Sequence, residues 1–309
     1  MTTTRPATPG DAPAILRLQH AHQRAVLGYP DATVDDVREV LADPDRDPAS
    51  CVVVDDGGRA LGFAMVFADG VSEHTDLDVV VDPDHGAHLL PLLLERALDI
   101  ALAGARARGR ANVQADVGCY RMDTALANAL HARGFSPATS FHRMRRDLGG
   151  PVDVVLPPGI VVERVEEEID EVLRRAHRLH MSTFARHFRF VARPFEEWMA
   201  GHRARTGTGP LWFATANGAD VGFLYETSQF VEDQDAGYVW LLGVERAARG
   251  RGIARGLLLS SFAAMRASGR RAALLHVDTA NATGATALYE SVGMRPVVVI
   301  DVWRCLRMT

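Results

Sequence analysis

The chain repeats itself, and this internal repeat constrains the fold more than any other feature of the sequence. Leu-Gly-Phe at residues 61–63 matches Val-Gly-Phe at residues 221–223, and Arg-Gly-Phe at residues 133–135 matches Val-Gly-Met at residues 292–294. The offset is 159 or 160 residues at each landmark. A fixed offset of this kind is typical of a tandem duplication. We therefore expect two similar folding units rather than one large domain.

Glycine and proline clusters mark the junction between the two repeats. Gly-Gly-Pro at residues 149–151 and Pro-Pro-Gly at residues 157–159 flank a short segment near the middle of the chain. Such clusters interrupt regular structure where packed units end. A length of 309 residues also suits two domains of ordinary size. We predict an N-terminal unit at residues 1–150 and a C-terminal unit at residues 151–309.

The composition argues against several classes of protein. A hydrophobic share of 47% with 24% charged residues argues against disorder, and no apolar run is long enough to cross a membrane. The net charge of -5 argues against nucleic acid as a partner. Three cysteines without a CxxC spacing support neither a disulfide framework nor a zinc site, and we expect no bound metal. The N-terminus lacks the apolar stretch of a secretion signal, so the expected compartment is the cytoplasm.

Hydrophobic periodicity predicts the order of elements in the second repeat. Strands are expected at residues 160–165, 211–215, 221–230, 237–244, 272–277 and 295–303, and helices at residues 168–180, 194–204, 253–269 and 281–291. Asn217 and Gly218 suit a tight hairpin turn between two of these strands. This order predicts an α/β, or α+β, fold in which each unit has a mixed, mostly antiparallel twisted sheet flanked by helices.

One loop of the second repeat carries the clearest chemical signal. Residues 244–257 join a predicted strand to a predicted helix, where the first backbone N–H groups have no acceptor within the helix and the helix dipole favours an anion. Gly250, Gly252 and Ala254 let an anion approach the backbone closely. Arginines at positions 246, 249, 251 and 255 add positive charge. The loop therefore predicts a polyanionic ligand, and the alternative is a solvated, arginine-rich helix start.

The loop is part of a longer motif that resembles a known family. Arg249-x-x-Gly252-x-Ala254, preceded by Leu-Leu-Gly-Val at residues 241–244 and followed by Asn281 and residues 287–294, resembles the GNAT superfamily of acetyl-CoA-dependent N-acetyltransferases over residues 160–304. The resemblance implies that acetyl-CoA is the cosubstrate and that Tyr289 is the general acid. It also implies contacts to the coenzyme from Leu242, Gly243, Val244, Arg249, Gly250, Arg251, Gly252, Ile253, Ala254, Arg255 and Asn281.

Acetyl transfer to an amine also needs a group that accepts a proton. An alkyl ammonium with a pKa of ~10 is almost entirely charged at pH 7 and must lose a proton before it attacks a thioester. Glu226 lies on the strand predicted beside the cofactor strand and is our predicted base, and a solvent-facing structural role is the alternative. Acidic residues at positions 232, 233 and 235 follow it. This chain resembles one two-unit member of the family in layout and length, and in that enzyme a glutamate presumed to be the base lies at the position of Tyr238.

The first repeat lacks the features that predict anion binding at residues 244–257. The matching segment, residues 81–92, is two residues shorter and has Asp82 and Asp84 where phosphates would lie, and Pro91 removes a backbone N–H group. The position that matches Tyr289 is Leu130. We predict a degenerate unit that neither binds acetyl-CoA productively nor catalyses. It would serve as a scaffold or as one wall of an acceptor pocket.

Two further patterns are less specific. His85 with His88, and His177 with His180, have the spacing of one helix face, but no third ligand accompanies either pair, so surface histidines are the favoured interpretation. Residues 184–190 mix aromatic side chains with cations, which suits either a wall of the acceptor site or packing against the other half.

Taken as a sequence, the chain is predicted to be an acetyl-CoA-dependent N-acetyltransferase that acts on the primary amine of a small molecule, with its active site in the C-terminal unit. Non-catalytic acyl-CoA binding or sensing, and protein N-acetylation, are the alternatives. We expect no nucleic acid or membrane partner, and a monomer or homodimer.

Overall fold

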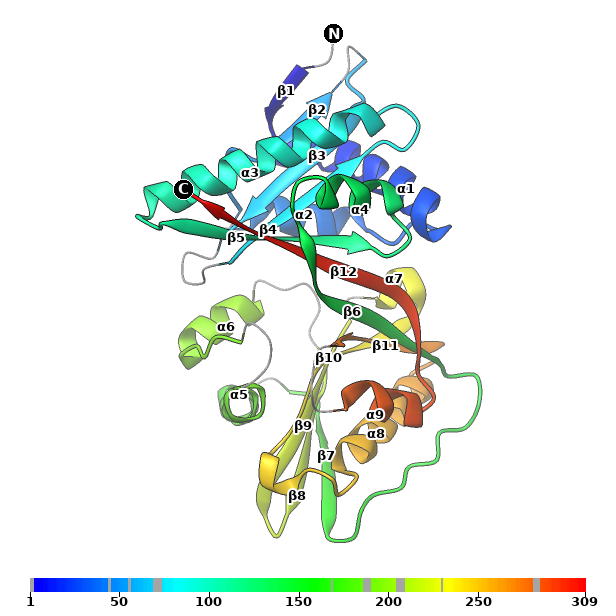
Figure 1. Cartoon of the computed structure of the whole chain (residues 1–309). Helices are drawn as coiled ribbons and strands as arrows, with labels where there is room; N and C mark the ends of the chain where they lie inside the picture. Colours follow the sequence, from blue (N-terminus) through cyan, green and yellow to red (C-terminus); the bar gives the residue numbers. More distant parts are fainter. Residues whose placement is uncertain are drawn as a thin grey trace. The chain divides into compact units, whose positions relative to one another are not determined.

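The computed structural model describes residues 3–43, 46–54, 57–68, 74–167, 169–185, 190–203, 209–228, 230–279 and 284–309 (Figure 1). The chain forms two compact units. Unit 1 consists of Met1–Ser140 together with Val298–Thr309, and unit 2 consists of Phe141–Val297. Each unit has its own set of strands and its own hydrophobic core.

The two repeats contain the same elements in the same order. The first repeat has β1 (Thr3–Pro6), α1 (Ala12–Leu27), α2 (Val34–Ala42), β2 (Cys51–Val54), β3 (Ala60–Phe67), β4 (His74–Val81), α3 (Leu90–Ala107), β5 (Asn112–Tyr120), α4 (Thr124–His131) and β6 (Ser136–Asp147). The second has β7 (Ile160–Val165), α5 (Asp170–Phe184), α6 (Phe195–Arg203), β8 (Leu211–Ala216), β9 (Ala219–Thr227), α7 (Val231–Gln234), β10 (Ala236–Val244), α8 (Ile253–Ala267), β11 (Ala272–Asp278), α9 (Ala285–Ser291) and β12 (Arg295–Met308). Only α7 has no counterpart among the described helices of the first repeat.

The sheets are mixed and mostly antiparallel, which confirms the predicted fold class. The strand order is β1-β2-β3-β4-β5-β12 in unit 1 and β6-β11-β10-β9-β8-β7 in unit 2. In each sheet one central pair is parallel, β4 with β5 and β10 with β11, and the other pairs within the unit are antiparallel. None of the helices that the structure describes has the length and apolarity needed to cross a bilayer.

The final strand of each repeat pairs with a strand of the other repeat. Residues 300–308 of β12 pair with β5 of unit 1, and residues 141–147 of β6 pair with β11 of unit 2. A bidentate ion pair supports the first exchange, because Arg304 donates hydrogen bonds of 2.7 Å to both carboxylate oxygens of the buried Asp116 on β5. The structural units therefore differ from a single cut between residues 150 and 151.

Helices cover both faces of the sheet in unit 2, and this position shapes the site. Successive residues of a strand point to opposite faces. On β9, Leu224 packs with Leu258 and Phe262 of α8, whereas Phe223 packs with the helices α5 and α6. Asn217, with φ of 50°, and Gly218, with φ of 78°, form the predicted turn that brings β8 to β9.

Several element boundaries differ from the sequence-based expectation. The helix expected at residues 168–180 runs from Asp170 to Phe184, and the strand expected to end at residue 303 continues to Met308 in the sheet of unit 1. The acidic segment after β9 contains the short helix α7, which was not among the predicted helices. Both extensions add packing contacts with a neighbouring element, which local periodicity does not show.

Candidate active site

The central parallel strands of unit 2 separate from each other, and the candidate site lies where they do. β10 pairs with β11 only between Ala236–Tyr238 and Ala272–Leu274, although β10 continues to Val244. On its other edge β10 stays paired with β9 as far as Val244, with an irregularity between Val239 and Leu241. Beyond Tyr238, no described strand pairs with the β11 side of β10. An extended ligand with amide groups could therefore add to this edge.

A cavity of about 300 Å³ lies beside this open edge. It is lined by Thr183, Leu242, Gly243, Val244, Ala248, Arg249, Gly250, Gly252, Ile253, Ala254, Arg255, Ala285, Leu288 and Tyr289. Most residues that the sequence placed at a cofactor site are therefore close together. Arg251 is exposed and is not in this lining, and Asn281 lies outside the described residues.

The backbone at the start of α8 is arranged to receive an anion. Gly250 and Gly252 have φ of 77° and 81°, a left-handed conformation that glycine adopts without strain. Gly252 is the N-cap, and the first helical hydrogen bond runs from the Gly256 N–H to the Gly252 carbonyl at 3.0 Å. The N–H groups of residues 253–255 therefore have no acceptor within the helix, and the positive end of the helix dipole lies beside the cavity.

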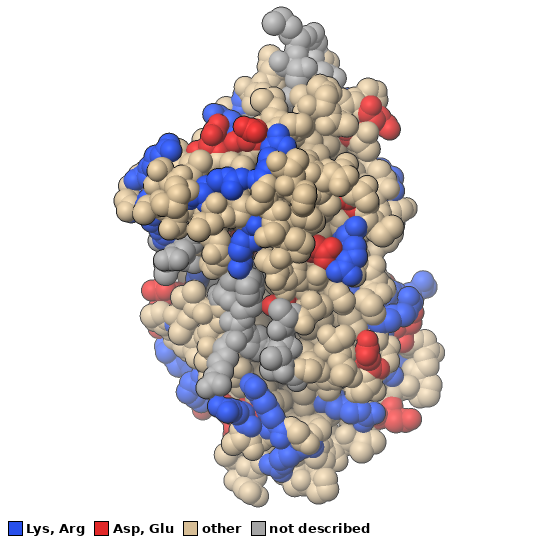
Figure 2. Space-filling view, viewed as in Figure 1, with Lys and Arg blue, Asp and Glu red and all other residues tan. Residues whose placement is uncertain are grey.

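The arginines of this loop do not all have the role that their sequence positions indicate. Arg249 donates from Nε to the carbonyl of Val244 at 3.0 Å and from a terminal nitrogen to the carbonyl of Thr183 at 3.2 Å. Its guanidinium thus fastens the loop to β10 and α5. Arg255 is exposed and lines the cavity. The face drawn in Figure 2 carries both basic and acidic side chains.

Close packing of α5 on β10 explains the glycine at position 243. A Cβ atom built on Gly243 would lie 2.2 Å from Oγ1 of Thr183 and 2.8 Å from Cε1 of Phe223. The Thr183 hydroxyl is held in place because it donates a 2.6 Å hydrogen bond to the Leu179 carbonyl. Gly243 therefore lets the helix approach the wall of the cavity.

We expect Gly243→Ala to destabilise the protein by about 1–3 kcal/mol, because the added methyl group overfills this contact. Thr183→Ala in the same chain should recover part of the loss. The matched control is Gly149→Ala, where an added Cβ meets no atom within 4 Å. Denaturant unfolding measures all three proteins, and an unchanged midpoint for Gly243→Ala would contradict the packing argument.

Tyr289 is the titratable side chain that lines the cavity from α9. Its residue is 9% exposed and belongs to the core cluster on the α8 side of the sheet. Burial, and secondarily the charge that Tyr238 can carry, raise the pKa of Tyr289 to about 12. The phenol therefore stays protonated at neutral pH and can donate a hydrogen bond or a proton into the cavity.

The predicted base, Glu226, lies in the core beneath α8 rather than in the cavity lining. It is 7% exposed, and Oε1 of its carboxylate accepts a 2.6 Å hydrogen bond from the indole N–H of Trp212. Burial raises the pKa of Glu226 to about 7, although Ser261 and Trp212 act in the opposite direction. Glu226 therefore neither faces solvent nor lines the cavity.

The buried carboxyl makes stability depend on pH. The pKa of Glu226 is about 7 in the folded chain and has an ordinary value of 4.5, so the folded state holds its proton more tightly. The proton on Glu226 therefore adds about 3 kcal/mol to the free energy of unfolding. This contribution is fully present below pH 4.5 and is lost as the pH rises through 7. We expect Glu226→Gln to remove this part of the pH dependence. Parallel slopes for variant and wild type, in denaturant unfolding at pH 5 and pH 8, would contradict the expectation.

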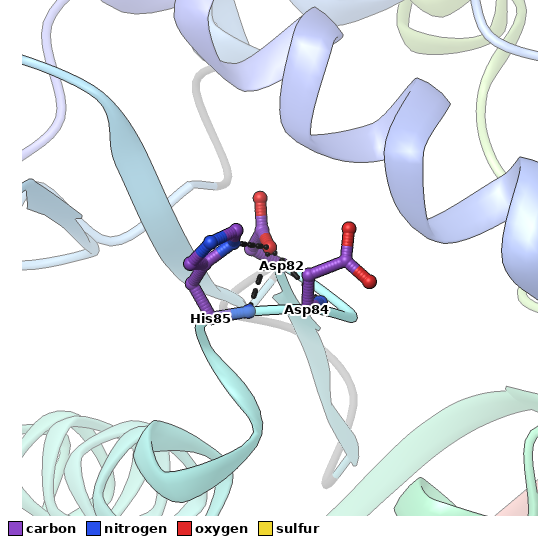
Figure 3. Close-up of side chains that lie close together, drawn as sticks. All are labelled: Asp82, Asp84 and His85. Carbon is purple, nitrogen blue, oxygen red and sulfur yellow. Dashed lines mark hydrogen bonds and ion pairs between the residues drawn. The ribbon is translucent and has the colours of Figure 1, made fainter.

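The matching turn of unit 1 is closed by its own carboxylate (Figure 3). Oδ1 of Asp82 accepts hydrogen bonds from the backbone N–H groups of Asp84 at 3.1 Å and His85 at 2.9 Å, and Oδ2 accepts from Arg59 at 2.5 Å. Burial would raise the pKa of Asp82, but these donors hold it below its usual range. An internal anion thus occupies the amide groups that a phosphate would need. The grouping of Asp82, Asp84 and His85 is accounted for as a turn cap.

The opening between the central strands is smaller in unit 1. β4 and β5 remain paired as far as Leu77 and Val117. The cavity beside them measures about 100 Å³ and is lined by polar groups that include His22 and Asp123, whose Nε2 and Oδ2 atoms are 3.0 Å apart. The first repeat therefore keeps the separated strands but has neither the space nor the glycine loop of unit 2.

The remaining sequence patterns have structural partners. Nε2 of His177 is 2.8 Å from the Arg193 carbonyl, and Nδ1 of His180 accepts a hydrogen bond from the Trp198 indole. Phe184 and Phe190 pack around the ring of His180. Residues 186–189 of the aromatic and cationic segment lie outside the described residues, so the choice between its two interpretations stays a prediction.

Comparisons with known proteins identify the family. The sequence profile of the Acetyltransferase (GNAT) family matches residues 168–294. A mycothiol acetyltransferase from Thermobispora bispora is 30% identical over 301 residues, which cover 93% of this chain and 93% of that protein. A GCN5-related N-acetyltransferase from Sphaerobacter thermophilus has a TM-score of 0.82 and 25% identity, covering 100% of this chain and 96% of that one. A tandem GNAT protein from the clavulanic acid biosynthesis pathway has the same fold, with a TM-score of 0.72 and 17% identity over 99% of this chain and 98% of that one. The chain therefore belongs to the GNAT family of acetyltransferases.

Proposed function

We propose that the protein transfers an acetyl group from acetyl-CoA to the primary amine of a small molecule, and that the cavity of unit 2 is its active site. One observation carries the proposal: an open strand edge, a helix N-terminus and a protonated tyrosine all border the same cavity of about 300 Å³. These three features suit, in turn, the amide-bearing arm, the diphosphate and the leaving sulfur of a coenzyme thioester.

The described residues fit the coenzyme. Residues 242–244 lie on the part of β10 that β11 leaves unpaired, and they line the cavity. The amides of the pantetheine arm could pair with backbone groups there that β9 and Arg249 do not use. The N–H groups of residues 253–255 could bind the diphosphate, with Gly250 and Gly252 leaving room for it. Arg255 lies at the cavity and Arg251 is exposed on the same loop, so both could add charge to the phosphate contacts. Asn281 stays a proposed contact of the coenzyme arm.

Acetyl-CoA supplies the activated acyl group, and the protein has to move protons around it. The phenol of Tyr289 can donate a proton to the sulfur as the bond between sulfur and the acyl carbon breaks. Because its pKa is about 12, the phenol is protonated at neutral pH and its hydrogen is available to the departing sulfur. Unit 1, whose turn amides already bind Asp82, has no equivalent role in coenzyme binding, and we propose that it is catalytically degenerate.

The relatives narrow the choice of acceptor to test first. The T. bispora relative is named a mycothiol acetyltransferase, and the layout of two repeats resembles mycothiol synthase, which acetylates the amine of a cysteinyl pseudodisaccharide. A cysteinyl amine is therefore our first candidate acceptor. Non-catalytic acyl-CoA binding and acetylation of protein amines are the competing functions.

Thiol release from acetyl-CoA, measured with a panel of amines, tests the function. The panel contains S-methylcysteinamide, glucosamine, ethylamine and a short peptide with a free N-terminus. We expect release above the hydrolysis background with a small primary amine. Release only with the peptide would favour protein acetylation, and binding of acetyl-CoA without release for any amine would favour the non-catalytic function.

A further inference from the structure

A chain of three polar side chains crosses the sheet of unit 2 at the closed end of the separated strands. Arg143 on β6 donates from Nε to Nε2 of His276 on β11 at 3.1 Å. Nδ1 of the same imidazole is 2.8 Å from the hydroxyl oxygen of Tyr238 on β10. Both Arg143 and Tyr238 are 8% exposed, and Phe230 packs against the guanidinium and against the phenol ring. Of the three, only Tyr238 was singled out from the sequence, as the residue at the position of a relative's presumed base.

The donor set fixes the direction of the hydrogen bonds. Arginine has hydrogen on Nε at every physiological pH, so Nε2 of His276 must act as the acceptor. A neutral imidazole that accepts at Nε2 carries its hydrogen on Nδ1. Nδ1 of His276 therefore donates to the oxygen of Tyr238. The chain of donors starts on a buried cation and ends on a phenol oxygen, and such a chain stabilises negative charge on that oxygen.

Tyr238 lies where β10 and β11 separate, in a different core cluster from Tyr289, and it is not among the residues that line the cavity of about 300 Å³. It belongs to the last residue pair before β10 and β11 separate. Tyr238 packs with Leu274, whereas Tyr289 packs in the cluster of Leu275, the next residue of β11. Neighbouring strand residues point to opposite faces, so the two phenols approach the gap from opposite faces of the sheet. They are close enough for charge on Tyr238 to affect Tyr289.

We infer that Tyr238, as a phenolate held by His276 and Arg143, is the base that takes the first proton from the acceptor ammonium; this inference rests on the proposed function. The freed amine forms a bond to the acyl carbon, and the bond between that carbon and the sulfur breaks. Tyr289 gives its proton to the departing sulfur. The second proton that the amine loses then restores the phenol of Tyr289. One proton is released per acetyl group transferred. Tyrosines in contrasting surroundings thus divide the two proton transfers, one as acid and one as base.

A first experiment observes the phenolate directly in the full-length protein. The ultraviolet absorbance of the wild type and of each His276 variant is followed as the pH is raised. The same titration is recorded for each of these proteins with Tyr238→Phe added. The difference between the two curves is the phenolate absorbance of Tyr238. We expect this signal to form at lower pH in the wild type than in His276→Phe, which breaks the donor chain. His276→Gln keeps one donor and one acceptor and should lie between them. Tyr29→Phe, which removes an exposed tyrosine of unit 1, is the control for loss of any tyrosine.

A second experiment separates proton removal from other steps. Ethylamine is charged at neutral pH and needs a base, whereas hydroxylamine is largely neutral and does not. With acetyl-CoA as donor, Tyr238→Phe should lower kcat/KM for ethylamine by about 100-fold or more and for hydroxylamine by less than about threefold. Raising the pH should restore the ethylamine reaction, because the amine then loses its proton to water.

The outcomes distinguish this inference from the function on which it rests. Equal losses for both amines, a phenolate signal that does not move in His276→Phe, or a larger ethylamine loss in Glu226→Gln than in Tyr238→Phe would each overturn the assignment of Tyr238. The acetyltransferase function would stand in those cases, provided that the wild type binds acetyl-CoA and releases thiol. A wild type that does neither would overturn the function and this inference together.

Discussion

Replacing Gly252 with aspartate should weaken acetyl-CoA binding by at least about 100-fold, or about 3 kcal/mol. The φ of 81° at this position is one that aspartate tolerates better than most residues, so the loop can keep its course. The new carboxylate would lie at the N-cap of α8, beside the N–H groups proposed to bind the diphosphate. Repulsion between like charges in a confined site then opposes binding. Isothermal titration calorimetry with acetyl-CoA measures the change.

Two further variants isolate the cause of that loss. Gly252→Asn has the same shape and the same backbone demand without the charge, so it should retain most of the affinity. Gly269→Asp places the same carboxylate after the other end of α8, where φ is 83° and a Cβ meets no atom within 4 Å. It should bind acetyl-CoA as the wild type does. Undiminished affinity in Gly252→Asp would contradict the proposed phosphate site.

Removing the hydroxyl of Tyr289 should lower kcat by about 100-fold while leaving acetyl-CoA affinity within about threefold of the wild type. The expected loss reflects a proton that the leaving sulfur must then take from water. The ring of Tyr289 fills the same space in Tyr289→Phe, so the cavity wall is retained. Steady-state kinetics with the best amine of the panel, together with calorimetry, separate the two effects. A normal kcat would remove Tyr289 from the mechanism.

The same group makes a prediction about pH. With a pKa of about 12, Tyr289 keeps its proton throughout the range in which the protein can be assayed. Its ionisation should therefore cause no fall in kcat between pH 7 and pH 10. A falling limb in that range that disappears in Tyr289→Phe would show that the phenol ionises much more easily than its burial indicates.

The sequence was informative where function depends on a short, local motif. Gly250, Gly252 and Ala254 lie in one loop, and the backbone conformation that they permit is set by residues next to one another. Most of the residues predicted to contact the coenzyme line one cavity. Four lining residues were not predicted: Thr183, Ala248, Ala285 and Leu288. The presence of Thr183, Ala285 and Leu288 at the cavity depends on how α5 and α9 pack on the strands.

The sequence was less informative where function depends on pairing across the chain. Arg143 lies in the first repeat, and only the exchange of β6 into unit 2 brings it to His276. Arg249 matches a phosphate-binding motif, yet its side chain is used to fasten the loop to backbone carbonyls. The burial of Glu226 under α8 likewise follows from which face of β9 turns inward, and a single residue in a predominantly apolar strand does not reveal that.

A crystal structure of the protein with coenzyme A tests the central claim most directly. The account predicts one coenzyme per chain, with its diphosphate at the N–H groups of residues 253–255, its extended arm along residues 242–244 and its sulfur near Tyr289. Unit 1 should hold none, because Asp82 occupies the matching amides. A coenzyme bound at the turn formed by Asp82 and Asp84, or bound in unit 2 away from the start of α8, would contradict it.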